Sequence, residues 1–189
     1  MRPPLPSRPR PIPAHWAIPA VLGLLIFMGD QLSKAWVVWW LGPEPFLRAI
    51  SLGPPWLNLV YAQNTGVAFG LFRQVPQFFA FTSILITAGA IYAYVFHLPN
   101  RSTWVQVAMG LILGGAVGNI VDRLRLGAVV DFISVGWWPV FNLADGAIST
   151  GVTALAVYLI FIGDDLPAAP HPTPRDDGLL SDLLNRDLE

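Results

Sequence analysis

The 189-residue chain contains no cysteine. It can therefore form no disulfide bond, no thiolate metal site and no lipid anchor on a cysteine of its own, and it has no cysteine nucleophile. Charged residues are also scarce, at 12% of the chain against about a quarter in an average soluble domain. Together with 54% hydrophobic residues, this balance predicts an integral membrane protein. The net charge of −1, with scattered basic residues, predicts no nucleic-acid partner.

Four long apolar runs predict four transmembrane helices, because each approaches the roughly 20 residues that a helix needs to cross a bilayer. We expect these helices at residues 16–40, 76–97, 103–121 and 140–162. The first run has no small-residue cleavage site and ends in Trp36, Trp39 and Trp40, so it is a retained span rather than a signal peptide. Gly110, Gly114 and Gly118 recur every four residues in the third run and predict close packing against another helix.

The distribution of basic residues predicts the topology. Four spans place both termini on one side, and that side carries more arginine than the other, which favours cytoplasmic termini. We expect residues 1–15 to form a disordered, basic, proline-rich tail and residues 163–189 a disordered acidic tail, with the four-span domain at 16–162 between them.

The two loops that then face outward have some character of β-structure. Residues 56–62 partly alternate between polar and apolar side chains and lead into the turn signal Asn64-Thr-Gly66. Residues 127–133 form a short β-branched run with Asp131 in its middle. The fold class that we expect is an all-α membrane protein with a small extracytoplasmic β-structure.

Acidic residues within or beside spans are candidate functional residues, because insertion of one at a helix centre costs about 2.5–3.5 kcal/mol. Asp30 and Lys34, four residues apart in the first span, can pair on one helix face. This pair is open to two interpretations, a structural salt bridge inside the membrane or part of a functional site.

Polar side chains also gather at the outer ends of the last two spans. Asn119, Asp122 and Arg123 share a face of the third span. Arg123 and its near neighbour Arg125 are the expected partners of Asp122, which would make this carboxylate structural.

The remaining acids have no such partner nearby. Asn142 and Asp145 share a face at the outer end of the fourth span, and Asp131 lies in the loop that joins the two ends. No basic residue lies within four positions of Asp131 or Asp145. The polar groups of both spans thus converge near the outer leaflet.

A pair of carboxylates is the chemistry that best fits these residues. The three histidines are far apart and form no His-Glu-x-x-His zinc motif, and Ser33 points away from its neighbour Lys34, the chain's single lysine. Two aspartates held close cannot easily both ionise, so one acts as base and the other as acid, and such a dyad can hydrolyse an amide. Spacing alone leaves open whether Asp122 or Asp131 is the partner of Asp145.

Two other interpretations of the same acids remain. A proton-coupled transporter would also use intramembrane carboxylates, although it would be expected to place them near the midplane and to show repeated halves. A scaffold of helices held together by polar contacts is the other. A single aspartate substitution that abolishes function in a folded protein would exclude the scaffold.

Five motifs resemble those of the bacterial lipoprotein signal peptidase family, signal peptidase II, in composition and order. They cover about residues 16–162 and read Asp30-Gln-Leu-Ser-Lys34, Asn64-Thr-Gly-Val-Ala-Phe69, Gly114-Gly-Ala-Val-Gly-Asn-Ile-Val-Asp-Arg123, Val129-Val-Asp-Phe-Ile133 and Phe141-Asn-Leu-Ala-Asp145. The sequence departs from the family pattern at Val67, where alanine is usual, and in its short link from Asp131 to Phe141.

The resemblance implies an aspartic endopeptidase of the bacterial inner membrane that cleaves prolipoproteins just before a diacylglyceryl-modified cysteine. It implies that Asp131 and Asp145 are catalytic, without a metal or cofactor. Substrate-binding or supporting residues would be Asp30, Lys34, Asn64, Gly66, Asn119, Asp122, Arg123 and Asn142. It further implies a monomer surrounded by membrane lipid, its active site toward the outer leaflet, with a β-structure that cradles the substrate beside a short surface helix.

Overall fold

The computed structural model describes residues 14–42, 48–66 and 76–163. The predicted tails lie almost wholly outside these residues, and so does Val67, so the structure does not test the expectations about them. The described residues contain four helices that are long and apolar enough to cross a membrane, which confirms the prediction of four spans. They are α1 (Ala17–Leu41), preceded by the 3-10 turn η1 (Ala14–Trp16), α2 (Pro76–Phe96), α3 (Thr103–Leu126) and α4 (Leu143–Phe161).

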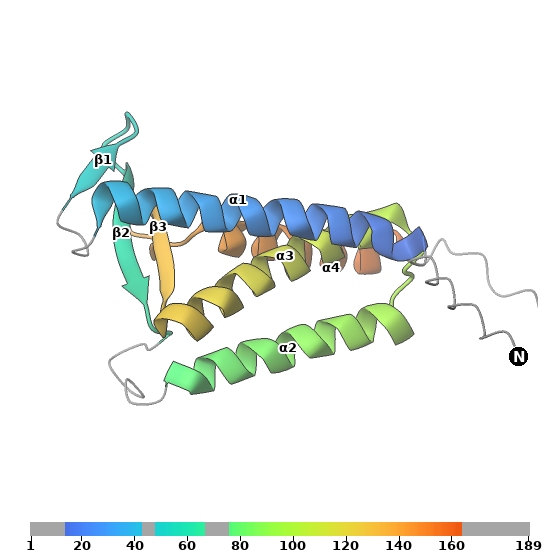
Figure 1. Ribbon diagram of the computed structural model, residues 1–189. Helices are drawn as coiled ribbons and strands as arrows, with labels where there is room; N and C mark the ends of the chain where they lie inside the picture. The colour runs from blue at the N-terminus through green and yellow to red at the C-terminus, as the bar shows by residue number, and fades with distance from the viewer. Residues whose placement is uncertain (1–13, 43–47, 67–75, 164–189) are drawn as a thin grey trace, which may run out of the picture.

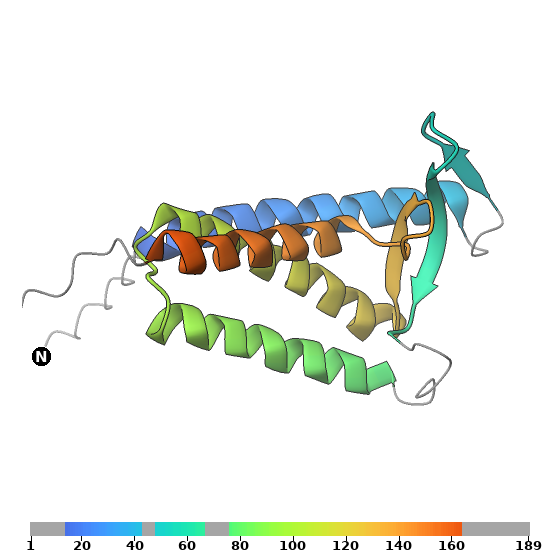
Figure 2. The same cartoon turned by 180° about the vertical axis from the view of Figure 1, so that it is seen from behind.

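Helix α3 is the centre of the bundle. It packs against α1, α2 and α4, with α4 behind it in Figure 1 and in front in Figure 2. A Cβ atom on Gly114 would lie 2.5 Å from the carbonyl oxygen of Gly23 on α1, so this crossing requires glycine and the predicted close packing is confirmed. Helix α1 begins and α4 ends at the same end of the bundle, opposite the sheet (Figures 1 and 2).

Two helix boundaries differ from the prediction, and in both cases the local backbone explains why. Helix α3 does not stop at residue 121 but continues to Leu126, where Gly127 adopts a left-handed conformation with φ 71° and its N–H closes the helix on the carbonyl of Arg123. Helix α4 does not begin at residue 140 but at Leu143, because Asn142 is its N-cap.

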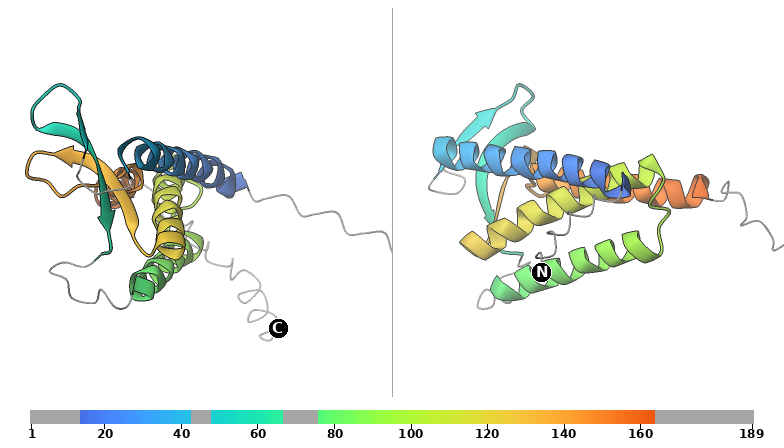
Figure 3. Two further views of the ribbon diagram at one scale, coloured as in Figure 1. Left: turned by 60° about the vertical axis from the view of Figure 1, so that its left-hand side comes forward. Right: turned by 45° about the vertical axis from the view of Figure 1, so that its right-hand side comes forward.

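A three-stranded antiparallel sheet lies across the C-terminal ends of α1 and α3 (Figures 1 and 3). Its order is β1 (Ala49–Ser51), β2 (Leu57–Asn64), β3 (Val129–Val135), so the two predicted β-runs pair with each other. Strand β1 was not predicted, because three residues are too short to show alternation. Apart from the four spanning helices and η1, the described residues form no helix, so the expected surface helix is not located among them.

The sheet is fixed to the bundle by an apolar cluster. Val37 and Leu41 at the end of α1 pack against Tyr61 of β2 and against Val130 and Phe132 of β3. Asp131 lies between those two β3 residues in the sequence and is itself buried, with 2% of its surface exposed. The packing of β3 on α1 therefore holds Asp131 at the sheet end of the bundle.

Candidate active site

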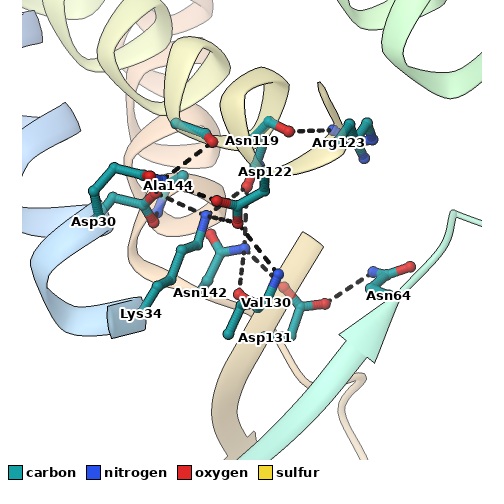
Figure 4. Close-up of polar contacts among 12 residues, drawn as sticks. Asp30, Lys34, Asn64, Asn119, Asp122, Arg123, Val130, Asp131, Asn142 and Ala144 are labelled. Atoms are coloured by element: carbon teal, nitrogen blue, oxygen red, sulfur yellow. Dashed lines mark hydrogen bonds and ion pairs between the residues drawn. The ribbon is translucent and has the colours of Figure 1, made fainter. Parts of the chain in front are cut away.

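Asp131 lies at the centre of β3, paired in register with Ala62 of β2. Its Oδ1 accepts a hydrogen bond from Asn142 Nδ2 at 2.7 Å, and its Oδ2 accepts one from Asn64 Nδ2 at 2.9 Å (Figure 4). Burial raises the pKa of Asp131 to about 6, and the charge of Asp145 adds to this effect, while the two asparagine hydrogen bonds oppose it. This carboxyl group therefore holds a proton far more readily than an exposed aspartate.

Asp145 occupies a different environment, in the first turn of α4. It forms a reciprocal capping box with Asn142: Asn142 Oδ1 accepts from Asp145 N at 2.9 Å, and Asp145 Oδ2 accepts from Asn142 N at 3.2 Å. Its Oδ1 accepts from Asn119 Nδ2 at 2.8 Å. The Asp145 carboxylate thus accepts two hydrogen bonds, from Asn142 N and Asn119 Nδ2, in the first turn of α4.

Asn142 joins the two aspartates. Its side-chain amide donates to Asp131, while its backbone N–H and side-chain oxygen bind Asp145. Asn142 is itself fully buried. One residue thus fixes a carboxyl group from the sheet relative to a carboxylate at a helix N-terminus.

Asn64 is oriented by Gly66. Gly66 N donates to Asn64 Oδ1 at 2.9 Å, so the Nδ2 group of Asn64 remains to donate to Asp131. Gly66 has φ 79°, a conformation that favours glycine, and a Cβ atom there would lie 3.0 Å from the ring of Phe79. The predicted turn at residues 64–66 therefore orients the Asn64 amide toward Asp131.

Lys34 is the centre of a buried ionic cluster, which Asn119 connects to Asp145. Its Nζ lies 2.7 Å from Asp30 Oδ2 and 2.9 Å from Asp122 Oδ2, and it donates to Asn119 Oδ1 at 3.0 Å. The predicted Asp30–Lys34 pair is confirmed. Because a protonated amine has three N–H bonds, these partners use all of them.

The expectation that Arg123 or Arg125 holds Asp122 is wrong. Lys34 of α1 takes that place, and the backbone N–H of Val130 also donates to Asp122 Oδ2, at 3.2 Å. The physical reason is helix geometry, since adjacent residues point to different faces, so Asp122 faces α1 while Arg123 faces away from it.

Two supporting residues were absent from the predicted site, although Gly118 was predicted to allow close helix packing. Gln31 Nε2 donates to Asp122 Oδ1 at 3.0 Å, and Gly118 leaves room for the Asp30 carboxylate, since a Cβ atom on it would lie 2.5 Å from Asp30 Oδ2. Asp30 also accepts from the backbone N–H of Ala144 at 3.0 Å and so binds the start of α4. Both residues stand within the motifs quoted above, but a sequence does not show which helix lies opposite.

A cavity of about 470 Å³ opens beside Asp145, between α2, α3 and α4. Asn119, Arg123 and Asp145 form its polar end, and its other lining residues are mainly apolar. A second cavity of about 360 Å³ lies between α2 and the C-terminal end of α3, and Arg123 lines it as well. Arg123 Nη1 donates to the carbonyl oxygen of Asn119 at 3.4 Å, while Arg123 Nε is buried and has no hydrogen-bond partner among the described residues. Arg123 therefore has an unpaired N–H group and lines both cavities.

The structure brings all ten predicted site residues into one connected region at the sheet end of the bundle. Figure 4 labels eight of them, all except Gly66 and Asp145. Among the described residues, no group of three histidine or acidic side chains could hold a metal ion. The arrangement offers a buried carboxyl group with a raised pKa, Asp131, a second carboxylate joined to it through Asn142, and a mainly apolar cavity that ends at Asp145.

Most of the chain is similar to known proteins. Residues 22–161 match the family model of signal peptidase II. The lipoprotein signal peptidase of Syntrophomonas wolfei is 41% identical over 141 residues, covering 74% of this chain and 91% of the relative, and that of Moorella thermoacetica is 40% identical over 140 residues with the same coverage. A solved structure of a bacterial membrane enzyme superposes with a TM-score of 0.68 at 27% identity, covering 76% of this chain and 93% of that one.

Proposed function

This chain belongs to the signal peptidase II family, and from that membership and the site geometry we propose that it is an aspartic endopeptidase that removes signal peptides from prolipoproteins. The observation that carries the aspartic mechanism is the position of Asn142, which binds Asp131 and Asp145 at once. Family membership gives no support to the proton-coupled transporter or to the scaffold.

The different surroundings of the two acids support separate roles. Asp131, whose pKa burial raises to about 6, is the acid, and Asp145, at the N-terminus of α4, is the base. Asp145 takes a proton from water as the water oxygen bonds to the scissile carbonyl carbon. Asp131 donates a hydrogen bond to the carbonyl oxygen. When the C–N bond breaks, Asp131 gives its proton to the leaving nitrogen, and the proton that Asp145 took from water then restores the protonated state of Asp131.

The two cavities support a substrate with two apolar parts. In this proposal the apolar segment of the signal peptide lies in the larger cavity, which leads from the far half of α3 to Asp145. The acyl chains on the substrate cysteine lie toward the smaller cavity. Arg123, which lines both cavities, binds carbonyl oxygens of the substrate near the scissile bond.

The proposed setting is the bacterial inner membrane, with both termini in the cytoplasm and the site toward the outer leaflet. The four spans and the arginine distribution support it. Acyl chains contribute about 0.8 kcal/mol per buried methylene, so a lipidated substrate stays in the bilayer and reaches the site by lateral diffusion. Cleavage just before the lipidated cysteine follows from a scissile bond held at the interface.

The test is cleavage of a diacylated prolipopeptide by the purified protein in bilayer nanodiscs, followed by mass spectrometry. We expect a product whose amino-terminal residue is the lipidated cysteine, and no product from the Asp145→Asn variant. The matched substrate has the same peptide sequence without lipid, and its cleavage should be much slower. Equal cleavage by wild type and Asp145→Asn would contradict the aspartic mechanism, and cleavage elsewhere in the peptide would contradict the proposed specificity.

A further inference from the structure

Three exposed tryptophans lie together at one end of the sheet. Trp56 precedes β2, and Trp137 and Trp138 follow β3, whose Val135 pairs with Leu57. The backbone N–H of Gly136 donates to the carbonyl oxygen of Trp56 at 2.7 Å, which holds the two loops together. The exposed fractions are 53% for Trp56, 89% for Trp137 and 56% for Trp138. With Leu52 of the β1–β2 loop, also exposed, we call this group the tryptophan tip.

The tryptophan tip carries no charge. Neither residues 49–64 nor residues 132–144, which supply its loops and strands, include an acidic or basic side chain. An exposed, uncharged patch that is rich in large apolar side chains marks a surface that contacts a membrane or another protein. The composition of the tip therefore indicates that it contacts a membrane or another protein.

The place of the tip in the fold indicates the partner. Figure 3 shows the β1–β2 loop and the β3–α4 loop projecting together sideways from the helices. Figures 1 and 2 show that these loops lie level with the last turns of α1 rather than beyond its end. Those turns carry Trp36, Trp39 and Trp40, all exposed, at the outer end of a membrane span. Indole rings concentrate at the headgroup level of a bilayer, so α1 marks this level for the tip as well.

We propose that the tryptophan tip inserts into the headgroup region of the outer leaflet, with phospholipid as its partner. The indole rings combine an apolar body with an N–H donor, which suits the boundary between acyl chains and headgroups. The tip lies at the same level as the exposed tryptophans of α1, Trp36, Trp39 and Trp40, and contacts lipid beside the bundle. The sheet is thus held at two places, by its apolar packing on α1 and by the lipid beneath its free end.

This contact has a consequence for the site. The β3–α4 loop that carries Trp137 and Trp138 also joins Asp131 to Asp145, and backbone hydrogen bonds between Ile133 and Phe141 close it at its base. Lipid contact at the tip therefore sets the height of the sheet relative to the bilayer, while the closed base keeps the two acids in place. This consequence rests on the proposed function, whereas the lipid contact itself does not.

Depth measurement with a nitroxide tests the proposal directly, because the natural chain has no cysteine to remove. Leu52→Cys places the label in the tip. Gln63→Cys is the matched control on β2, exposed and one residue from Asn64, so it points to the face away from Asp131. In bilayers of phosphatidylethanolamine and phosphatidylglycerol, the label at Leu52 should collide mainly with oxygen and the label at Gln63 mainly with a water-soluble nickel complex. Equal nickel accessibility at both positions overturns the proposal and would favour a protein partner for the tip.

A second experiment tests whether the tryptophans cause the insertion. In the variant Trp56→Ser/Trp137→Ser/Trp138→Ser, the label at Leu52 should become accessible to the nickel complex. Trp39→Ser, which removes an equally exposed tryptophan from α1, should leave the label where it was. Thermal unfolding checks that each variant is folded, and Trp137→Ser alone serves if the triple variant is not. An unchanged label depth in folded variants overturns the role of the tryptophans, and it does so whether or not the protein cleaves prolipopeptides.

Discussion

Lys34 donates a hydrogen bond from Nζ to Oδ1 of Asn119 at 3.0 Å, and this contact fixes which way the Asn119 amide points. With its oxygen bound to a cation, the amide presents its N–H group to Asp145, to which Nδ2 donates at 2.8 Å. A buried ionic cluster that touches no reacting group thus controls the hydrogen bonding of a proposed catalytic base.

Replacement of Lys34 should therefore lower the stability of the fold strongly. Lys34→Met leaves Asp30 and Asp122 buried without their cation, and breaking a buried pair in this way costs about 3–5 kcal/mol. Asp122→Asn should cost less, roughly 1.5–3 kcal/mol for a lost charge-assisted hydrogen bond, because Lys34 keeps Asp30. Thermal unfolding in detergent measures both. Equal stability of Lys34→Met and wild type would contradict the proposed role of the cluster.

The close contact between Gly118 and the Asp30 carboxylate gives a second prediction, for which Gly89 provides a control in the same chain. Gly118→Ala would place a Cβ atom 2.5 Å from Asp30 Oδ2, so it should displace this carboxylate from Lys34 and from the Ala144 N–H, and lower both the unfolding temperature and turnover. Gly89→Ala on α2 introduces the same atom where no atom lies within 4 Å. It should be neutral or slightly stabilising, since alanine favours helix over glycine by about 1 kcal/mol. Similar behaviour of the two variants would show that the Asp30 position tolerates displacement.

Sequence periodicity predicted those parts of the site that lie on one helix. The spacing of Asp30 and Lys34 gave their pairing, because residues four apart are neighbours on a helix. Asn142 and Asp145 also meet as predicted, but through the capping box rather than on a shared helix face, because Asn142 is the extended N-cap of α4. The lengths of the apolar runs gave the four spans for a similar reason. These are local properties of the chain.

Contacts between distant segments could not be predicted in the same way. Periodicity shows that Asp122 faces some neighbour, but not that the neighbour is Lys34 on α1, and this is why the arginine assignment was wrong. The place of Gly118 under Asp30 depends likewise on how α1 crosses α3. The capping box at Asn142 moved the start of α4 because a polar side chain that bonds the backbone outweighs the apolar character of residues 140 and 141.

The identity of the dyad gives a third prediction. Asp131→Asn and Asp145→Asn should each abolish cleavage, and the double variant should be no worse than either, because members of a catalytic unit are strongly non-additive. Asp122→Asn should retain turnover per folded molecule, since its hydrogen bonds go to Lys34, Gln31 and Val130 rather than to either acid. Cleavage assays normalised to folded protein distinguish the cases. Turnover by Asp131→Asn together with its loss in folded Asp122→Asn would make Asp122 the partner of Asp145.

The raised pKa of Asp131 gives a prediction about stability and pH. Its carboxyl group has a pKa of about 6 in the folded protein and 3.8 as its ordinary value, so between these two values the folded state holds a proton that the unfolded chain has released. The free energy of unfolding contributed by this group therefore falls as pH rises from about 4 to about 6, by roughly 3 kcal/mol, and stays low above that. Asp131→Asn removes the titration but keeps the shape of the side chain. Thermal unfolding of both proteins in detergent should show the variant gaining stability relative to wild type between pH 4 and pH 7, and a difference that does not change with pH would mean that Asp131 ionises freely in the fold.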